Sequence, residues 1–229
     1  AGYRIGVVDA DLPSPGLHVL FGLDKDRLAH TLNEYLHDQA TIEQVAHPLG
    51  KMEHTQPGLQ QLAGKKLWLY PASHNTSAIA RLFREGYDVG LFNDGLQEMH
   101  KYTALNYVFI DTHPGLGEET LLSIAVSDVL ILVMRPDQQD LQDTAMLVDV
   151  ARKLDVPEIY LLVNKVPSNI DPEQLRKTIE DRYNIPVAGV LPLSEELAEL
   201  GSADLFSLRY PEHPWSQRLR ELTQLLLPK

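Results

Sequence analysis

Short apolar runs alternate along the chain with stretches in which apolar residues recur every three or four positions. This alternation predicts βαβ units with parallel strands, and we expect an α/β fold of three layers, a mostly parallel sheet flanked by helices. The runs that predict strands are Arg4–Val8, Leu67–Tyr70, Tyr107–Ile110, Val129–Met134, Ile159–Val163 and Val187–Leu191. The stretches that predict helices are Asp26–His37, Ser77–Glu85, Glu119–Ser127, Asp140–Leu154, Pro172–Tyr183, Glu195–Leu200 and Trp215–Leu226.

Length and composition narrow the class of protein. With 229 residues, we expect one domain spanning residues 1–229. The net charge of −12 disfavours binding to nucleic-acid phosphate or anionic lipid, since both rely on clustered Lys and Arg. The absence of Cys excludes disulfides and thiolate metal sites. No signal peptide is recognisable and no apolar run reaches the ~20 residues that span a bilayer, so we expect a soluble, cytoplasmic protein.

Two acidic residues follow the first predicted strand, in the order Val7-Val8-Asp9-Ala10-Asp11. Acids two positions apart at a strand end begin on one face, so both can serve the water shell of one metal ion. The alternative is a pair of turn-forming residues, because Asp is common in turns. Four apolar residues precede Asp9 and a Pro-rich turn follows Asp11, and we favour the functional interpretation.

The second acidic strand end reads Asp111-Thr112-His113-Pro114-Gly115. An Asp at the carboxyl edge of a parallel sheet lies where open α/β folds bind ligands, and a nearby Gly lets a backbone N–H approach a phosphate. Together with Asp9 and Asp11 it suits a Mg²⁺–phosphate site. The alternative is an ordinary strand-to-helix loop, and we interpret His113 as a residue that shapes this loop.

Polar or irregular residues also end two later strands, at Asn164-Lys165 and at Pro192-Leu193. Amide and backbone groups at neighbouring strand ends can bind the edge of a purine. A different pattern, His30, Glu34 and His37, has the spacing of one helix face and of a metal site. We favour a solvated helix face over a metal site there.

In this order the motifs resemble those of the MinD/ParA family of deviant Walker ATPases, from Tyr3 to about Leu226. The resemblance rests on Val7–Asp11, Tyr70–Ser73, Phe109–Gly115, Val163–Lys165 and Gly189–Pro192. The Pro-Ala-Ser after Tyr70 and the segment Arg135–Asp140 look most like a MinD-like subgroup.

The resemblance implies ATP and Mg²⁺ as cofactors. By that resemblance Asp11 positions the attacking water and Asp9 helps to order the water shell of Mg²⁺. Asp111 corresponds to the Walker B residue, which acts on Mg²⁺ through water, and Gly115 to the glycine that senses the γ-phosphate.

The resemblance also implies that Asn164 and the backbone around Pro192 and Leu193 contact adenine. Members of the family form ATP-dependent homodimers and release partners upon hydrolysis, so we expect a homodimer and a protein partner or activator. We expect neither strong DNA binding nor autonomous membrane binding, because the chain is acidic and residues 1–229 contain no basic amphipathic tail.

One family motif, the loop Lys-Gly-Gly-x-Gly-Lys-Thr that cradles the phosphates, does not occur in residues 1–229. In the family fold its strand lies between those that correspond to Tyr107–Ile110 and Val129–Met134. We therefore expect a P-loop NTPase-like fold that lacks the first strand, the P-loop and the first helix, and no hydrolysis by this stretch alone. We also expect about 30 further N-terminal residues in the natural polypeptide, the usual size of a βαβ unit.

Two other functions stay open. The first is a degenerate, non-hydrolysing scaffold that keeps the dimer or partner surface, and ATP affinity discriminates it from the switch. The second, a minor alternative, is a phosphohydrolase that uses Asp9 and Asp11 as nucleophile and acid. Such an enzyme needs a second acidic pair after a later strand, where only Asp111 is found.

Overall fold

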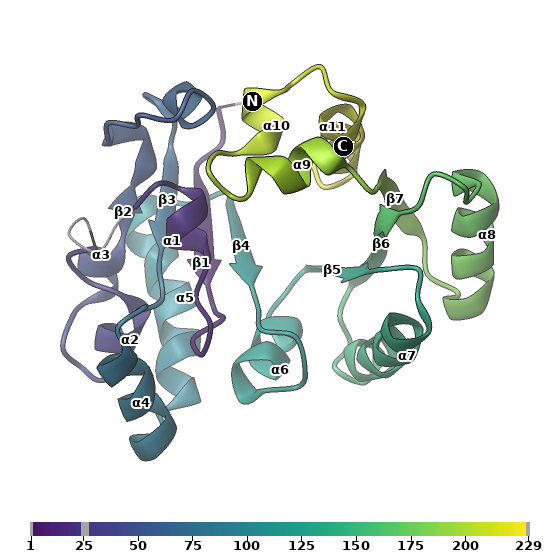
Figure 1. Cartoon of the computed structure of the whole chain (residues 1–229). Coiled ribbons are helices and arrows are strands. Elements are labelled where there is room, and N and C mark those ends of the chain that lie inside the picture. Colours follow the sequence, from purple (N-terminus) through teal and green to yellow (C-terminus); the bar gives the residue numbers. More distant parts are fainter. Residues whose placement is uncertain (1, 24–27, 228–229) are drawn as a thin grey trace. The chain divides into compact units, whose positions relative to one another are not determined.

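The computed structural model describes residues 2–23 and 28–227. The chain divides into two compact units, one formed by the residues up to Ser123 with Ser202–Leu205, the other by Ile124–Gly201 with the residues from Phe206 onward. Figure 1 labels the helices and strands of both.

The first unit is built on a four-stranded sheet in the order β2-β3-β1-β4. Strands β3, β1 and β4 are parallel, and β2 is antiparallel to β3. The elements, in chain order, are β1 (Ile5–Asp9), α1 (Leu17–Leu20), α2 (Leu32–Tyr35), α3 (Ile42–Val45), β2 (His47–Pro48), the short 3₁₀ helices η2 (Leu49–Lys51) and η3 (Leu59–Leu62), β3 (Leu67–Tyr70), α4 (Thr76–Glu85), α5 (Val89–Thr103), β4 (Tyr107–Asp111) and α6 (Glu118–Ala125).

The second unit is built on a three-stranded, entirely parallel sheet in the order β5-β6-β7. Its elements are β5 (Val129–Met134), α7 (Gln138–Lys153), β6 (Glu158–Val166), α8 (Pro172–Tyr183), β7 (Val187–Pro192), α9 (Glu195–Leu200), α10 (Phe206–Arg209) and α11 (Pro214–Leu225). Helix α11 packs against the sheet through Leu222, which is buried with Leu162 and Leu191. The predicted helix Trp215–Leu226 therefore contributes Leu222 to the core of this unit.

Each unit has its own buried core. In the first unit Val8 of β1 and Tyr70 of β3 are buried together with Phe92 and Met99 of α5. In the second unit Leu161 and Val163 of β6 are fully buried. The expected α/β architecture, with mostly parallel strands flanked by helices, is confirmed, and the strands form two sheets.

Strands β4 and β5 are edge strands of their sheets. Both carry exposed apolar side chains, since Phe109 of β4 is 45% exposed and Val133 of β5 is 60% exposed. Natural proteins rarely leave such edges uncovered.

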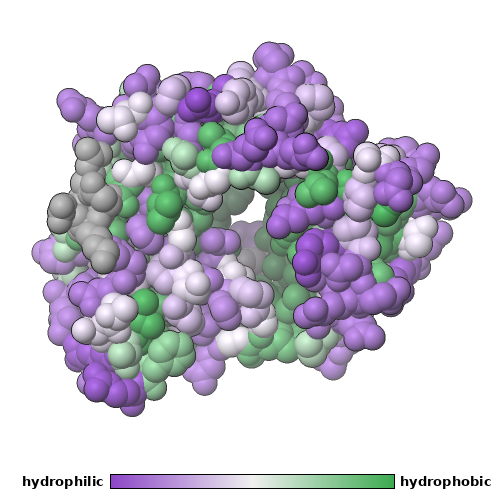
Figure 2. Space-filling model, viewed as in Figure 1, coloured by the Kyte–Doolittle hydropathy of each residue, from purple (hydrophilic) through white to green (hydrophobic). Residues whose placement is uncertain are grey.

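Figure 2 shows hydrophilic residues over much of the drawn face, with separate hydrophobic areas among them. Within the described residues, no helix is both long and apolar enough to cross a membrane.

Several helices differ from the sequence-based expectation. Helix α5, which the sequence pattern does not predict, contains Gly95 packed so closely on Tyr35 that a Cβ there would lie 2.8 Å from the Tyr ring. The expected helix Asp26–His37 is wrong in extent, because only Leu32–Tyr35 is helical and residues 26–27 lie outside the described residues. A capping box at Thr31 starts this short helix and thereby fixes its beginning.

Candidate functional site

Three carboxylates gather at the carboxyl end of β1 and β4 in the first unit. The register of the two parallel strands places Asp9 beside Asp111, and Asp11 follows two residues after the end of β1. Asp111 and Asp11 both act electrostatically on Asp9, and Asp11 acts on Asp111. The structure thus brings together the three acids that the sequence singled out.

Asp9 is completely buried, and its two oxygens have different surroundings. Oδ2 accepts hydrogen bonds from the backbone N–H of Gly16 (3.2 Å) and of Leu17 (3.1 Å). Oδ1 is buried with no hydrogen-bond partner among the described residues. Burial raises the pKa of Asp9 from 3.8 to about 6, because the two N–H donors offset only part of the burial and the neighbouring carboxylates add to it.

Asp111, by contrast, is exposed at the end of β4. Its pKa is raised above the usual range, first because surrounding protein partly desolvates the carboxyl and then because the Asp11 carboxylate lies nearby. Two acids of this site therefore hold their protons more tightly than free Asp does, first because burial disfavours the charged form and then because neighbouring carboxylates repel it.

Asp11 is held by two donors at a single oxygen. Its Oδ1 accepts from the backbone N–H of Ser14 at 3.0 Å and lies 3.1 Å from Nδ1 of His113. The Asp11 side chain is 17% exposed and that of His113 is 44% exposed, so the pair reaches water. The expectation that His113 only shapes its loop missed this contact, because 102 residues separate the two side chains.

Gly115 lies in the exposed loop between β4 and α6. Its φ of +119° falls where side chains other than glycine are strained, and no atom lies within 4 Å of the place a Cβ would take. The backbone conformation, not crowding, therefore favours glycine at this position.

The residues expected to contact adenine lie in the second unit. Asn164 and Pro192 lie towards the carboxyl ends of β6 and β7, and Leu193 follows with an exposed side chain. Oδ1 of Asn164 accepts from the N–H of Lys165 at 2.8 Å, and the N–H of Leu193 donates to the carbonyl of Val166 at 2.9 Å. The amide nitrogen of Asn164 takes no part in these bonds.

The expected solvated face formed by His30, Glu34 and His37 is wrong, because α2 is too short to carry all three. His37 is instead half-buried, and its Nε2 is buried with no partner among the residues that the structure describes. Among the residues that the structure describes, no group of three His, Cys, Asp or Glu side chains is arranged to hold a metal ion directly.

Comparison with known proteins identified several similar curated relatives, whereas no family model matches the chain. An uncharacterized ATP-binding protein of Methanocaldococcus jannaschii is 25% identical over 229 residues, 99% of this chain and 77% of the relative. The flagellum site-determining protein YlxH of Helicobacter pylori is 24% identical and matches 100% of this chain and 73% of its own length. An iron-sulfur cluster carrier protein of Pyrococcus horikoshii is 23% identical, and the match covers 100% of this chain and 77% of the relative.

Solved structures share the fold. The septum site-determining protein MinD of Pyrococcus horikoshii, complexed with Mg-ADP, superposes with a TM-score of 0.76 at 19% identity, covering 98% of this chain and 84% of that one. A chain of the MinC:MinD cell division protein complex of Aquifex aeolicus superposes with a TM-score of 0.73 at 17% identity. The match covers 100% of this chain and 86% of that one.

The α/β fold and the acidic edge of its first sheet are typical of a class of proteins that bind a phosphate ligand with a cation. Within that class, the relatives and the solved structures point to the MinD/ParA family of P-loop ATPases. The resemblance drawn from the sequence motifs is thereby confirmed.

Proposed function

We propose that this protein is an ATP-dependent dimerisation switch of the MinD/ParA type, with residues 1–229 acting as a single nucleotide-binding domain. The observation that carries the proposal is the cluster of Asp9, Asp11 and Asp111 at one edge of a parallel sheet. Three neighbouring carboxylates repel one another unless a cation or protons compensate them. A phosphate ligand accompanied by Mg²⁺ supplies that compensation.

The acidic edge fits a hydrated magnesium ion. Oδ1 of Asp9 is buried and lacks a partner among the described residues, and burial, followed by the neighbouring carboxylates, raises the pKa of Asp9 to about 6. Mg²⁺ usually keeps several waters and binds through one or two carboxylates and the substrate phosphates, which agrees with the absence of a three-ligand group in the described chain. Asp9 and Asp111 would hold the ion through water, and the ion would neutralise charge on the phosphates.

Asp11 is placed to orient a water molecule. The N–H of Ser14 and the ring of His113 both bind Oδ1, so the carboxylate is held in one orientation, and the Asp11 side chain as a whole is 17% exposed to water. A carboxylate held in this way accepts a hydrogen bond from water and aligns its oxygen for attack. His113 acts on this step only through Asp11, as a positioning residue.

The resemblance to the family supports a phosphate contact by Gly115 in the first unit and, taken by itself, an adenine contact at the strand ends of the second unit. Residues with the freedom of Gly115 let a backbone N–H approach a terminal phosphate. The unengaged amide nitrogen of Asn164 and the backbone carbonyls of Pro192 and Leu193 match the donors and acceptors of an adenine edge.

The proposed switch acts through other proteins. One structurally similar MinD is found in a MinC:MinD complex, which supports a homodimer that recruits a protein partner or activator. The acidic composition supports neither strong DNA binding nor autonomous membrane binding. Site determination, the process in the names of YlxH and MinD, and iron-sulfur cluster carriage are the processes that the relatives suggest.

A non-hydrolysing scaffold is the second candidate, because residues 1–229 contain no phosphate-cradling loop. Backbone N–H groups of that loop supply most phosphate contacts in P-loop proteins. A switch therefore requires the loop from the complete natural polypeptide, whereas a scaffold does not.

The deciding experiment measures MgATP affinity and turnover of the natural polypeptide and of its Asp11→Ala variant. We expect the variant to bind MgATP as the parent does and to lose at least about 100-fold in turnover, because water is no longer oriented. Asp181→Ala, which removes an exposed carboxylate of α8, is the control and should change neither quantity. Absence of MgATP binding in the parent would favour the scaffold, and unchanged turnover in Asp11→Ala would refute the role of Asp11.

A further inference from the structure

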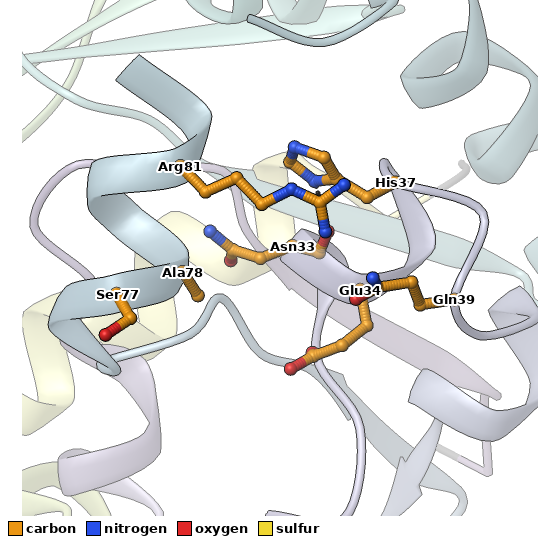
Figure 3. Close-up of a pocket in the computed structure, with 7 residues that line it drawn as sticks. All are labelled: Asn33, Glu34, His37, Gln39, Ser77, Ala78 and Arg81. Atoms are coloured by element: carbon orange, nitrogen blue, oxygen red, sulfur yellow. Dashed lines mark hydrogen bonds between the residues drawn. The ribbon is translucent and has the colours of Figure 1, made fainter. Parts of the chain in front are cut away.

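Charged side chains line a cavity of about 180 Å³ between α2 and α4 of the first unit (Figure 3). Of these, Glu34 accepts through Oε2 from the backbone N–H of Thr31 at 2.8 Å, and Arg81 donates through Nε to Oε2 of Glu85 at 2.7 Å. Both charges are thus engaged within the chain, and none of the three carboxylates of the candidate site lines the cavity. The loop between β4 and α6 differs, because one of its side chains contacts Asp11 directly.

Most of this loop is exposed to water. Residues 114–118 are exposed, and Gly115 has a φ of +119° with no atom within 4 Å of the place a Cβ would take. Glycine also has more backbone freedom than any other residue. Burial therefore does little to fix these residues, and the position of His113 depends chiefly on the hydrogen bonds at the two ends of the loop.

One of these bonds is made by Thr120, in the first turn of α6. Its hydroxyl donates to the carbonyl oxygen of His113 at 3.2 Å, and the residue is only 4% exposed. A hydrogen bond sheltered from water is electrostatically stronger than an exposed one. The bond closes the loop onto the helix and thereby holds the backbone of His113.

The same turn of α6 is held from its other side by Glu119. Oε2 of Glu119 accepts from the hydroxyl of Tyr87, which precedes α5, at 3.1 Å. Burial, followed by the charge of Glu119, raises the pKa of Tyr87, so this hydroxyl keeps its proton and acts as the donor. Thr120 therefore presents its own hydroxyl from a helix turn that is itself anchored.

The ring of His113 extends this connection to Asp11. Nδ1 lies 3.1 Å from Oδ1 of Asp11, and a carboxylate only accepts, so Nδ1 carries the proton. The His113 side chain is 44% exposed, so packing restrains the ring only in part. The direction of the ring consequently follows from its backbone position and from this bond.

We propose that Thr120 is a positioning residue that fixes His113 and, through it, the carboxylate of Asp11. The inference rests on the proposed function, in which Asp11 orients the attacking water. The hydroxyl of Thr120 orders the backbone of His113, and the ring of His113 orders Oδ1 of Asp11. The first turn of α6 thereby controls how well the water is oriented, and a shift of this turn lowers turnover without a change at the carboxylates.

Thr120→Val in the natural polypeptide tests this role, because valine has a similar shape and lacks the hydroxyl. We expect turnover of MgATP to fall about fivefold, the effect of one lost hydrogen bond, with MgATP affinity unchanged. Thr120→Ser keeps the hydroxyl and should stay within about twofold of the parent. The matched control is Thr178→Val, because the Thr178 hydroxyl donates to the carbonyl of Gln174 within α8, and it should leave turnover unchanged.

The ¹⁵N NMR signals of the His113 ring provide a readout that a general loss of stability would not produce. A free neutral imidazole carries its proton mainly on Nε2, whereas the bond to Asp11 keeps the proton on Nδ1. Thr120→Val should shift the ring toward the Nε2–H form, and Thr120→Ser and Thr178→Val should not. His113→Ala assigns the signal by removing it.

Failure of this inference and failure of the proposed function give different results. A parent that hydrolyses MgATP, with turnover and ring signal unchanged in Thr120→Val, would overturn the role of Thr120 and leave the proposed function intact. Equal losses in Thr120→Val and Thr120→Ser would reduce the effect to packing, and lower turnover with an unchanged ring signal would overturn the route through His113. A parent without turnover would refute the proposed switch, and the ring signal would still decide whether Thr120 orders His113.

Discussion

The strand ends of the two units differ in how well their polar groups are satisfied. At the end of β1, in the first unit, Asp9 keeps one buried oxygen without a partner in the described residues. At the ends of β6 and β7, in the second unit, Oδ1 of Asn164 and the N–H of Leu193 each have a hydrogen-bond partner.

The Asp9 carboxylate is thus left incompletely compensated, whereas the cited polar groups at the strand ends of the second unit are hydrogen-bonded. The charged form of a buried carboxylate with a raised pKa is disfavoured, and nearby positive charge would stabilise it. Groups of this kind are frequent at functional sites. The bonds at the strand ends of the second unit instead stabilise the turns that carry them. Replacing Asp9 should therefore raise stability, whereas replacing Asn164 should leave it nearly unchanged.

The largest expected effect is a loss of stability from the core of the second unit. Leu161→Ala removes a fully buried side chain of β6 and should lower the free energy of unfolding by roughly 3 kcal/mol through lost burial and a cavity. Urea unfolding, monitored by circular dichroism, measures this loss of free energy. The control is Leu225→Ala, because the Leu225 side chain is 52% exposed in the parent. We expect one cooperative transition, because we propose a single domain, and two separate transitions would contradict that proposal.

A smaller effect of opposite sign is expected at Asp9. Because the folded state raises its pKa from 3.8 to about 6, the folded protein binds the proton more tightly, and stability falls as pH rises through this window. Asp9→Asn keeps an acceptor for Gly16 and Leu17 and removes the charge. It should raise the free energy of unfolding by roughly 2 kcal/mol above pH 7, where Asp9 is ionised.

Thermal unfolding of Asp9→Asn and of the parent between about pH 3 and pH 8 checks this expectation. The difference in stability should close below the unfolded pKa of 3.8. Asp181→Ala, an exposed carboxylate in the second unit, provides the comparison and should follow the parent at every pH. A variant less stable than the parent above pH 7 would show that the Asp9 carboxylate is better compensated than its surroundings indicate.

The smallest effect is expected at Asn164. Its side chain bonds only the next backbone N–H among the described contacts, so Asn164→Ala should change the free energy of unfolding by less than about 0.5 kcal/mol. If the amide contacts adenine, MgATP affinity of the natural polypeptide should still fall several-fold. Titration of the parent and the variant with MgATP and with Mg-GTP, whose base edge differs, tests for a contact with the base. Loss of a base contact should change the two affinities unequally, whereas a general loss of nucleotide binding would weaken both affinities equally.

Sequence patterns predicted the strands better than the helices. Continuous apolar runs gave β3 and β5 with the observed bounds, because each run begins directly after a charged residue and ends where a turn with Pro follows. The sequence pattern did not predict helix α5, because Gly90 and Gly95 have low helix propensity. In the structure Gly95 makes room for the Tyr35 ring. Such tertiary packing has no signature in a single sequence.

The candidate site shows the same division. The strand-end pattern predicted that Asp9, Asp11 and Asp111 gather, because parallel strands bring their carboxyl ends to one edge. The contact of His113 with Asp11 depends on the path of two loops, and no local pattern encodes it. The roles assigned to these residues stay predictions.

The four residues Ser202–Leu205 belong to the first unit, although the chain on both sides belongs to the second. Within them Asp204 is buried and accepts from the N–H groups of Gly58 and Leu59 at 2.8 and 3.1 Å. Neither unit is consequently a continuous piece of polypeptide. A fragment ending at Ser123 would lack the carboxylate that ties down its own loop, so no single cut of the chain yields either unit intact.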